Sequence, residues 1–181
     1  MKPTEEAIEM IFGDPFRFAI LIQRIPEWSN ADFNHGLFHF LIDGEFLPSD
    51  ARASTLWVDV YSLLSDTNAL FSLRENKALF ELEAAEAFKK IHAMTDPEFQ
   101  AATENIADAG YSVFAVSSGE NVRVLGARHG VLRQNGDRPV WVELADYDVK
   151  EAILSKNEIK EILTRVARYF EDMRVSHPTT H

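Results

Sequence analysis

The chain has 181 residues, 46% of them hydrophobic, with 29 Asp and Glu against 18 Lys and Arg and no cysteine. A chain of this length can fold on its hydrophobic core alone, and the lack of cysteine excludes thiol nucleophiles, cysteine zinc sites and iron–sulfur clusters. Residues 27–108 hold 15 acids and 5 bases, so they carry −10 of the net charge of −11, and such a charge disfavours direct binding of nucleic acid.

The first predicted elements are strands. Residues Phe16–Arg24 alternate in hydrophobicity, which predicts a strand with Phe16 on its core face. Residues Leu37–Phe46 repeat the alternation, and the Asp43-Gly44 pair predicts that this strand bends into a hairpin. The alternation in Thr55–Tyr61 predicts a third strand, partly exposed on one side.

The middle of the chain is predicted to contain helices. Residues 62–83 mix turn residues with short apolar runs, which suits either a short helix and a strand or an extended loop. Apolar residues recur at helical spacing in Glu83–Ala93. Asp96-Pro97-Glu98 is a helix start signal, and Gly110 is expected to end that helix.

The last part is predicted to return to strands and to close with a long helix. Strands at Tyr111–Val116, Asn121–Arg128 and Pro139–Leu144 are expected to form an antiparallel meander. Ser155 and Glu158 have the spacing of a capping box, and an apolar stripe follows them through Met173. This order of elements predicts an α+β fold with a largely antiparallel sheet and a long C-terminal helix.

We expect a single domain over residues 1–181, because no repeat, low-complexity tract or Pro/Gly-rich linker divides the sequence. Met1–Met10 contain three glutamates and no apolar run of signal-peptide length, so we expect a cytoplasmic protein. No stretch approaches the roughly 20 consecutive apolar residues of a membrane-spanning helix. We therefore expect no membrane association.

The sequence offers little for catalysis or for a metal. His35, His39 and Asp43 recur at intervals of four residues, but this spacing covers roughly 13 Å along a strand, too far for two side chains to share one ion. We therefore expect no metal site, no cofactor and no enzymatic activity, and we expect His39 to be partly exposed. Ser117-Ser118-Gly119 lacks the pattern of a nucleophile elbow.

A surface is the better candidate for function. Acidic and aromatic residues are interleaved between Glu27 and Asp66, and protein interfaces favour aromatic anchors within a polar rim. The other interpretation of these aromatic residues is that Phe33 and one Trp belong to the hydrophobic core. The residues expected to form the docking surface are Glu27, Trp28, Asp32, Asp43, Glu45, Asp50, Asp59, Tyr61 and Asp66.

Several segments resemble one protein family. Gly13-Asp14-Pro15-Phe16 leads into FAILIQRIPEWS, and FNHGLFHFLIDGEFLPS and STLWVDV follow. These segments resemble the N-terminal half of immunity protein family 42 of bacterial polymorphic toxin systems. VWVELADYDVKEAILSKNEIKEIL is similar to the closing strand and helix of that family, and the resemblance extends from about Gly13 to Phe170.

The resemblance implies a cytoplasmic protein that binds and neutralises a cognate toxin domain, without enzymatic activity or a cofactor. The acidic middle of the chain suits a basic, nuclease-like toxin, whose active or substrate-binding surface this protein would occlude. Two other hypotheses remain open, namely a small acidic hydrolase that uses Asp, Glu and His, and a scaffold module that self-associates. The expected state is a monomer or a homodimer.

Overall fold

A computed structural model describes residues 10–30, 33–136 and 138–175. Its elements in chain order are β1 (Ile11–Asp14), β2 (Phe18–Arg24), η1 (Pro26–Trp28), β3 (His35–Ile42), β4 (Glu45–Leu47), β5 (Ser54–Thr55), α1 (Leu56–Leu63), α2 (Ala69–Ser72), α3 (Lys77–Phe80), α4 (Ala84–Met94), η2 (Pro97–Phe99), α5 (Glu104–Asp108), β6 (Tyr111–Ser118), β7 (Asn121–Arg128), β8 (Gly130–Asn135), β9 (Arg138–Glu143), β10 (Lys150–Ser155) and α6 (Lys156–Val175). The antiparallel sheets, the inserted helices and the long C-terminal helix confirm the predicted α+β fold class.

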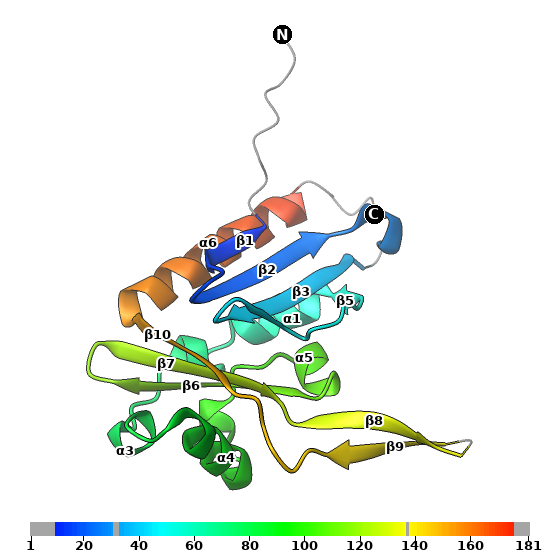
Figure 1. Cartoon of the computed structure of the whole chain (residues 1–181). Coiled ribbons are helices and arrows are strands. Elements are labelled where there is room, and N and C mark those ends of the chain that lie inside the picture. Colours follow the sequence, from blue (N-terminus) through cyan, green and yellow to red (C-terminus); the bar gives the residue numbers. More distant parts are fainter. Residues whose placement is uncertain (1–9, 31–32, 137, 176–181) are drawn as a thin grey trace.

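The strands form three antiparallel sheets. Sheet A has the order β1-β2-β3-β4, with β5 also paired to β3; sheet B has the order β10-β7-β6; and β8 and β9 pair with each other. In Figure 1, α1 and α6 lie behind sheet A, α3 and α4 lie below sheet B, and the β8–β9 hairpin extends to one side. Within the described part of the chain, every helix is too short or too polar to cross a bilayer.

The core has two parts because strands β6 and β7 of sheet B are buried on both faces. Through Val113 and Val124, one face contributes to a cluster shared with sheet A, α1 and α6. Through Phe114 and Leu125, the other face contributes to a cluster that includes Phe88 of α4. Burial on both faces explains why β6 carries the continuous apolar run Val113–Val116 and why β7 carries apolar residues on both sides from Val124 to Ala127.

The strand predicted over residues 16–24 is confirmed from Phe18 onwards, but the position expected for Phe16 is wrong. The Phe16 side chain is 80% exposed. Asp14 to Arg17 form a turn between β1 and β2, in which Asp14 Oδ1 accepts a hydrogen bond from Phe16 N and Asp14 O accepts one from Arg17 N. Because the turn interrupts the extended backbone, the alternation of β2 does not reach Phe16.

The predicted bend at Gly44 is confirmed. Asp43 and Gly44 both have positive φ values, 53° and 78°, which a two-residue hairpin loop of this kind requires. Strand β4 then returns antiparallel to β3, with Glu45 opposite Ile42.

The third strand predicted over residues 55–61 is wrong, because Thr55 ends the short strand β5 and residues 56–61 begin α1. The alternation of Leu56, Val58 and Val60 fits a strand. However, Leu56, Val60 and Leu63 also recur on one helical face, and all three are fully buried. Val58 is 39% exposed, which agrees with the helical period. A run this short fits both periods, so the packing of α1 against β3, α5 and α6 decides its structure.

The helix predicted from Asp96 to Gly110 starts at the expected residue but is interrupted. Asp96 Oδ1 accepts a hydrogen bond from Glu98 N at the start of η2. The chain then becomes extended, because the Ala101 and Ala102 N–H groups both donate to a carbonyl oxygen of β6, and a new helix, α5, follows. The helix predicted over residues 83–93 is confirmed as α4, and the ambiguous residues 62–83 contain the short helices α2 and α3.

The predicted meander is wrong in its third strand. Strands β6 and β7 pair as expected, with Phe114 opposite Leu125. The strand predicted at Pro139–Leu144 forms as β9, but it pairs with β8. The other edge of β7 pairs instead with β10, with Ala152 opposite Val124. Local alternation identified these strands but carried no information about their partners.

The predicted C-terminal helix is confirmed as α6. Ser155 Oγ accepts a hydrogen bond from Glu158 N, and Glu158 Oε2 accepts one from Ser155 N at 2.7 Å, as in a capping box. Its predicted apolar stripe is buried against sheet A, α1 and β10, and consists of Ile159, Ile162, Leu163, Val166, Phe170 and Met173.

Candidate functional site

The fold disperses the nine residues that were expected to form a docking surface. Asp32 lies outside the described residues. Asp59 is completely buried, so the expectation that it belongs to an exposed surface is wrong. The remaining seven are exposed, namely Glu27, Trp28, Asp43, Glu45, Asp50, Tyr61 and Asp66.

Asp59 instead connects α1 to two neighbouring segments. Its Oδ1 accepts a hydrogen bond of 2.5 Å from Thr103 Oγ1, and its Oδ2 accepts hydrogen bonds from Ser54 Oγ and, at 2.9 Å, from Asn105 Nδ2. Burial raises the pKa of Asp59, and these hydrogen bonds oppose the rise. No local pattern indicates this role, because the three partners lie in β5, just before α5 and within α5.

Four of the exposed residues lie at the two ends of β3. Glu27 and Trp28 are in η1, directly before β3, whereas Asp43 and Glu45 are in the turn and strand after it. A strand of eight residues spans roughly 26 Å, so the two pairs cannot touch. They can, however, border one interface, since a partner that covers about 800 Å² reaches across such a distance.

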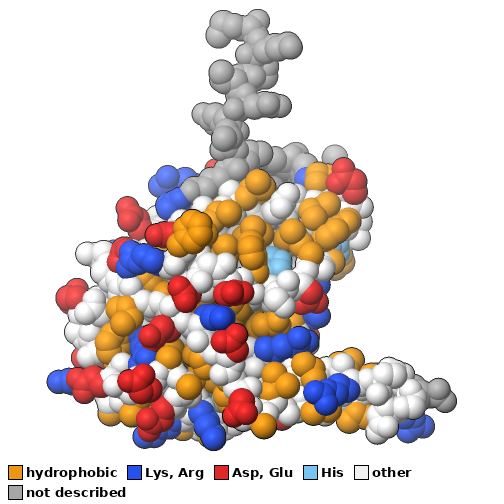
Figure 2. Space-filling model, in the orientation of Figure 1, with side chains coloured by type: hydrophobic (Ala, Val, Ile, Leu, Met, Phe, Trp, Pro, Cys, Tyr) orange, Lys and Arg blue, Asp and Glu red, His pale blue; other side chains and the backbone are white. Residues whose placement is uncertain are grey.

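The outward side of sheet A lies between these two ends, and we call it the open face. Its side chains come from neighbouring strands, with Ile11 of β1 opposite Leu21 of β2, and Leu21 opposite His39 of β3. Phe46 of β4 lies opposite Leu41. Helices α1 and α6 lie on the other side of the sheet, and Figure 2 shows hydrophobic side chains gathered over sheet A on the face turned to the viewer.

His39 is buried on this face, contrary to the expected partial exposure. Only 4% of its surface is accessible, its Nδ1 lies 2.9 Å from Pro48 O, and the ring of Phe46 contacts it edge-on at 5.6 Å. Burial lowers the pKa of His39, although the Pro48 carbonyl opposes this effect. His39 therefore supports the packing of Phe46.

Two phenylalanines project from the Asp43 end of the open face. Phe46 is 44% exposed and Phe16 is 80% exposed. The turn that carries Phe16 and the turn that leads into β4 and Phe46 are joined by backbone hydrogen bonds, since Asp43 N donates to Arg17 O and Gly44 N donates to Pro15 O. Exposed aromatic side chains on a rigid support, next to carboxylates, have the composition of a protein-binding anchor.

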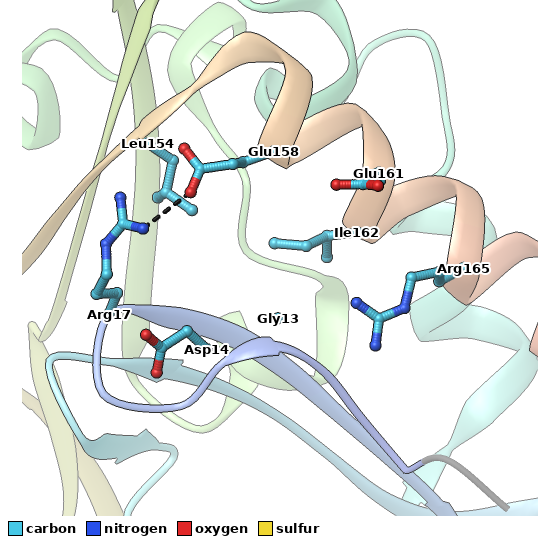
Figure 3. Close-up of a pocket in the computed structure, with 8 residues that line it drawn as sticks. All are labelled: Gly13, Asp14, Arg17, Leu154, Glu158, Glu161, Ile162 and Arg165. Carbon is cyan, nitrogen blue, oxygen red and sulfur yellow. Dashed lines mark hydrogen bonds and ion pairs between the residues drawn. The ribbon is translucent and has the colours of Figure 1, made fainter.

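A shallow cavity of about 110 Å³ lies beside these turns, between β1 and α6. Its charged lining residues include Asp14 and Arg17 of the turn and Glu158 and Arg165 of α6 (Figure 3). Pockets that enclose a drug-sized ligand measure about 300 Å³ or more, so this cavity is too small for one. A protein surface is therefore a better candidate site than this cavity.

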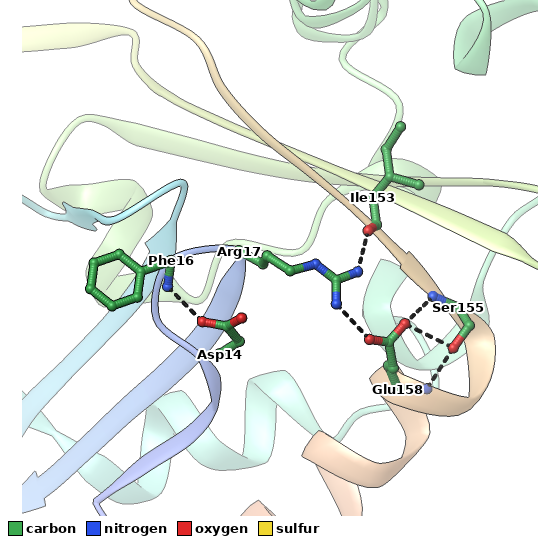
Figure 4. A network of polar contacts seen from close by, with 6 residues as sticks. All are labelled: Asp14, Phe16, Arg17, Ile153, Ser155 and Glu158. Carbon is green, nitrogen blue, oxygen red and sulfur yellow. Dashed lines mark hydrogen bonds and ion pairs between the residues drawn. The ribbon is translucent and has the colours of Figure 1, made fainter.

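The polar network at this cavity also argues against general acid catalysis. Arg17 donates to Glu158 Oε1 and to Ile153 O, both at 2.8 Å (Figure 4). Hydrogen bonds from the Ser155 backbone, from Arg17 and from the Ser155 hydroxyl lower the pKa of Glu158. A carboxyl group that acts as a general acid near neutral pH needs a raised pKa, so Glu158 is unsuited to that task.

The structure brings together one group of possible metal ligands that the sequence analysis did not consider. His92, His129 and Glu143 come from three separate segments, and one ligand atom of each lies within 4.8 Å of the others. Burial, and then the neighbouring His92, lower the pKa of His129, and Glu143 opposes this effect. No motif spacing could reveal this group.

The acidic residues of the segment 27–108 do not share one surface. Glu27, Asp43 and Glu45 lie at the ends of the open face, whereas Glu86 is on α4 and Asp108 is on α5. The concentration of charge in the sequence is therefore spread over different sides of the fold.

Two comparisons with known proteins found a match, one to a protein family and one to a solved structure. The family model of immunity protein 42 matches residues 10–169. Among solved structures, the crystal structure of CdiI from Burkholderia dolosa AUO158 is similar, with a TM-score of 0.66 at 19% sequence identity, and the alignment covers 88% of this chain and 99% of that chain. No curated protein matches the chain.

Proposed function

Because this chain belongs to the immunity protein 42 family of polymorphic toxin systems, we propose that it binds a cognate toxin domain in the cytoplasm and neutralises it. The observation that carries the proposal is the family match over residues 10–169, which includes every strand of sheets A and B. The protein acts as an inhibitor by direct binding, and its surface rather than a catalytic centre performs the function.

The open face supports this proposal as the docking surface. Its exposed apolar side chains lie towards its margins: Ile11 is 38% exposed on β1, Phe16 and Phe46 project at one end, and Trp28, which is 45% exposed, lies at the other. Desolvated aromatic anchors supply most of the free energy at protein interfaces, and a surrounding polar rim excludes water from them. A toxin seated on this face has its own active or substrate-binding surface occluded.

Acidic residues at both ends of the open face supply the complementary charge for a basic toxin. Asp43 and Glu45 are exposed beside the two phenylalanines, and Glu27 is exposed next to Trp28. Opposite charges at the rim of an interface mainly accelerate association, whereas buried apolar contacts slow dissociation. We therefore expect association with the toxin to slow as the salt concentration rises.

The direct test is to express the toxin domain encoded beside this protein and to titrate it with the purified chain. We expect a stoichiometric complex by calorimetry, loss of the toxin's activity in the same titration, and protection of cells that express both proteins. A folded toxin domain that neither binds this chain nor loses activity in its presence would remove the proposal.

A double charge reversal tests which surface the toxin uses. We expect Asp43→Lys together with Glu45→Lys to reduce the association rate constant about tenfold or more at low salt, because both carboxylates border the proposed interface. Glu86→Lys together with Asp108→Lys changes the net charge equally, but the two residues lie on α4 and α5, away from the open face. Stopped-flow association kinetics should show little change for this control, and equal slowing by both pairs would contradict the proposed location.

A further inference from the structure

His92, His129 and Glu143 meet where α4 approaches the base of the β8–β9 hairpin. His92 is in the last turn of α4, His129 lies between β7 and β8, and Glu143 ends β9. The centroids of the two imidazole rings are 5.0 Å apart, and His92 Nε2 lies 3.8 Å from Glu143 Oε2. One nitrogen or oxygen atom from each of the three side chains falls within 4.8 Å of the others.

The backbone holds two of these residues together independently of their side chains. Leu144 N donates to His129 O at 2.8 Å, and Gly130 lies opposite Glu143 in the β8–β9 ladder. His129 N in turn donates to Gly110 O at 2.7 Å, which ties this segment to the turn before β6. The convergence of the two side chains is thus built into the fold.

One ring nitrogen of His129 lacks a hydrogen-bond partner in the part of the chain that the structure describes. His129 Nδ1 is buried and has no hydrogen-bond partner among the described residues. A buried polar atom without a partner costs about 1–3 kcal/mol, and a bound ion is one of the partners that removes this cost. The contact between His92 and Glu143 leaves this His129 nitrogen unpaired.

Aromatic side chains pack beside the two histidines of the group. The ring of Trp141 lies 5.7 Å from that of His129, and the rings of Phe88 and Tyr147 lie 6.0 Å and 5.6 Å from that of His92. These rings restrict access of water to the two imidazoles, whereas the Glu143 carboxylate stays open to solvent.

We propose that His92, His129 and Glu143 form a binding site for a divalent transition-metal ion of the Zn²⁺ class. Two imidazoles and one carboxylate are a donor set that Zn²⁺ favours, whereas Mg²⁺ and Ca²⁺ prefer sites made of oxygen atoms. Ligand atoms around tetrahedral Zn²⁺ are about 3.3 Å apart, so the side chains must draw together by rotation when they bind the ion. Binding ties α4 to the base of the hairpin.

The test uses the full chain, free of any tag and stripped of metal with a chelator. We expect it to bind one Zn²⁺ per chain by calorimetry, and its melting temperature to rise by about 5 °C or more at a hundredfold excess over the dissociation constant. Mg²⁺ should produce no such shift. Stripped protein that neither binds Zn²⁺ nor melts at a higher temperature in its presence would overturn the proposal.

Variants locate the site. We expect His92→Gln, His129→Gln and Glu143→Gln each to weaken Zn²⁺ binding by about a hundredfold, because each removes one ligand of three. Glu143 is the safest of them, since its side chain is 62% exposed and its replacement does not disturb the core. His35→Gln and the pair His177→Gln with His181→Gln remove other histidines as controls. Loss of binding in either control, with binding retained in Glu143→Gln, would assign the ion elsewhere and contradict the proposal.

Discussion

Replacing Phe16 with alanine is expected to raise the dissociation constant of the toxin complex about thirtyfold, equivalent to about 2 kcal/mol. The side chain is 80% exposed in the free protein and projects from the turn between β1 and β2, beside the open face. Removal of such an exposed ring costs the free protein little stability, but it removes an anchoring contact from the complex. Calorimetry with the cognate toxin measures the change, and the unfolding temperature should stay the same within about 2 °C.

Phe71→Ala is the matched control. Phe71 is 52% exposed, but it lies on α2, which packs against β6 and α6 rather than on the open face. The control removes the same ring from another side of the molecule, so toxin binding should be unaffected. Phe46→Ala provides a second measurement at the open face, and normal affinity in both Phe16→Ala and Phe46→Ala would show that the toxin binds elsewhere.

Replacing Asp59 with alanine is expected to lower the free energy of unfolding by about 3 kcal/mol. The carboxylate is fully buried and accepts hydrogen bonds from Ser54, Thr103 and Asn105. Alanine leaves these groups without an acceptor and creates a small cavity between α1 and α5. Urea denaturation at neutral pH measures the loss, and a change below about 1 kcal/mol would contradict this account.

Asp59→Asn separates the hydrogen bonds from the charge. An asparagine oxygen can accept the bonds from Ser54 and Asn105, while its amide group donates to the Thr103 hydroxyl, so this variant should remain within about 1 kcal/mol of the native protein at neutral pH.

The pH dependence of Asp59→Asn follows from the raised pKa of Asp59 in the folded protein. A carboxyl group with a raised pKa contributes stability that is complete below its ordinary value of 3.8 and is lost as the pH rises through the folded value. The neutral amide undergoes no such loss. The stability of Asp59→Asn relative to the native chain should therefore increase from pH 4 towards neutral pH, and a constant difference over that range would contradict the raised pKa.

Sequence patterns identified most strands because their signal is local. In β2 the inward side chains alternate, and in α6 a capping box precedes an apolar stripe, so each of these elements could be located from its own residues. The failures have a common cause. Residues 55–61 fit both the strand and the helical period, and the partner of β9 depends on hydrogen bonds that no local pattern encodes.

The exposure of the candidate site residues, too, was predicted correctly only in part. The sequence pointed to Trp28, Asp43 and Glu45, and the structure leaves all three exposed at the ends of one sheet. It also pointed to Asp59, which an acid-rich pattern cannot distinguish from a surface carboxylate, although the fold buries it in a hydrogen-bonded network. Phe16 was expected in the core because alternation does not show where a strand gives way to a turn.

The sequence by itself determined the α+β class, the capped C-terminal helix and the family, because each depends on residues that are neighbours along the chain or on a pattern spread over most of it. Only the tertiary structure decided which side of sheet A stays open, that Asp59 is interior, and that His92, His129 and Glu143 converge. These features arise from contacts between segments distant in the sequence, where burial and strand pairing, rather than local preference, set the position of each side chain.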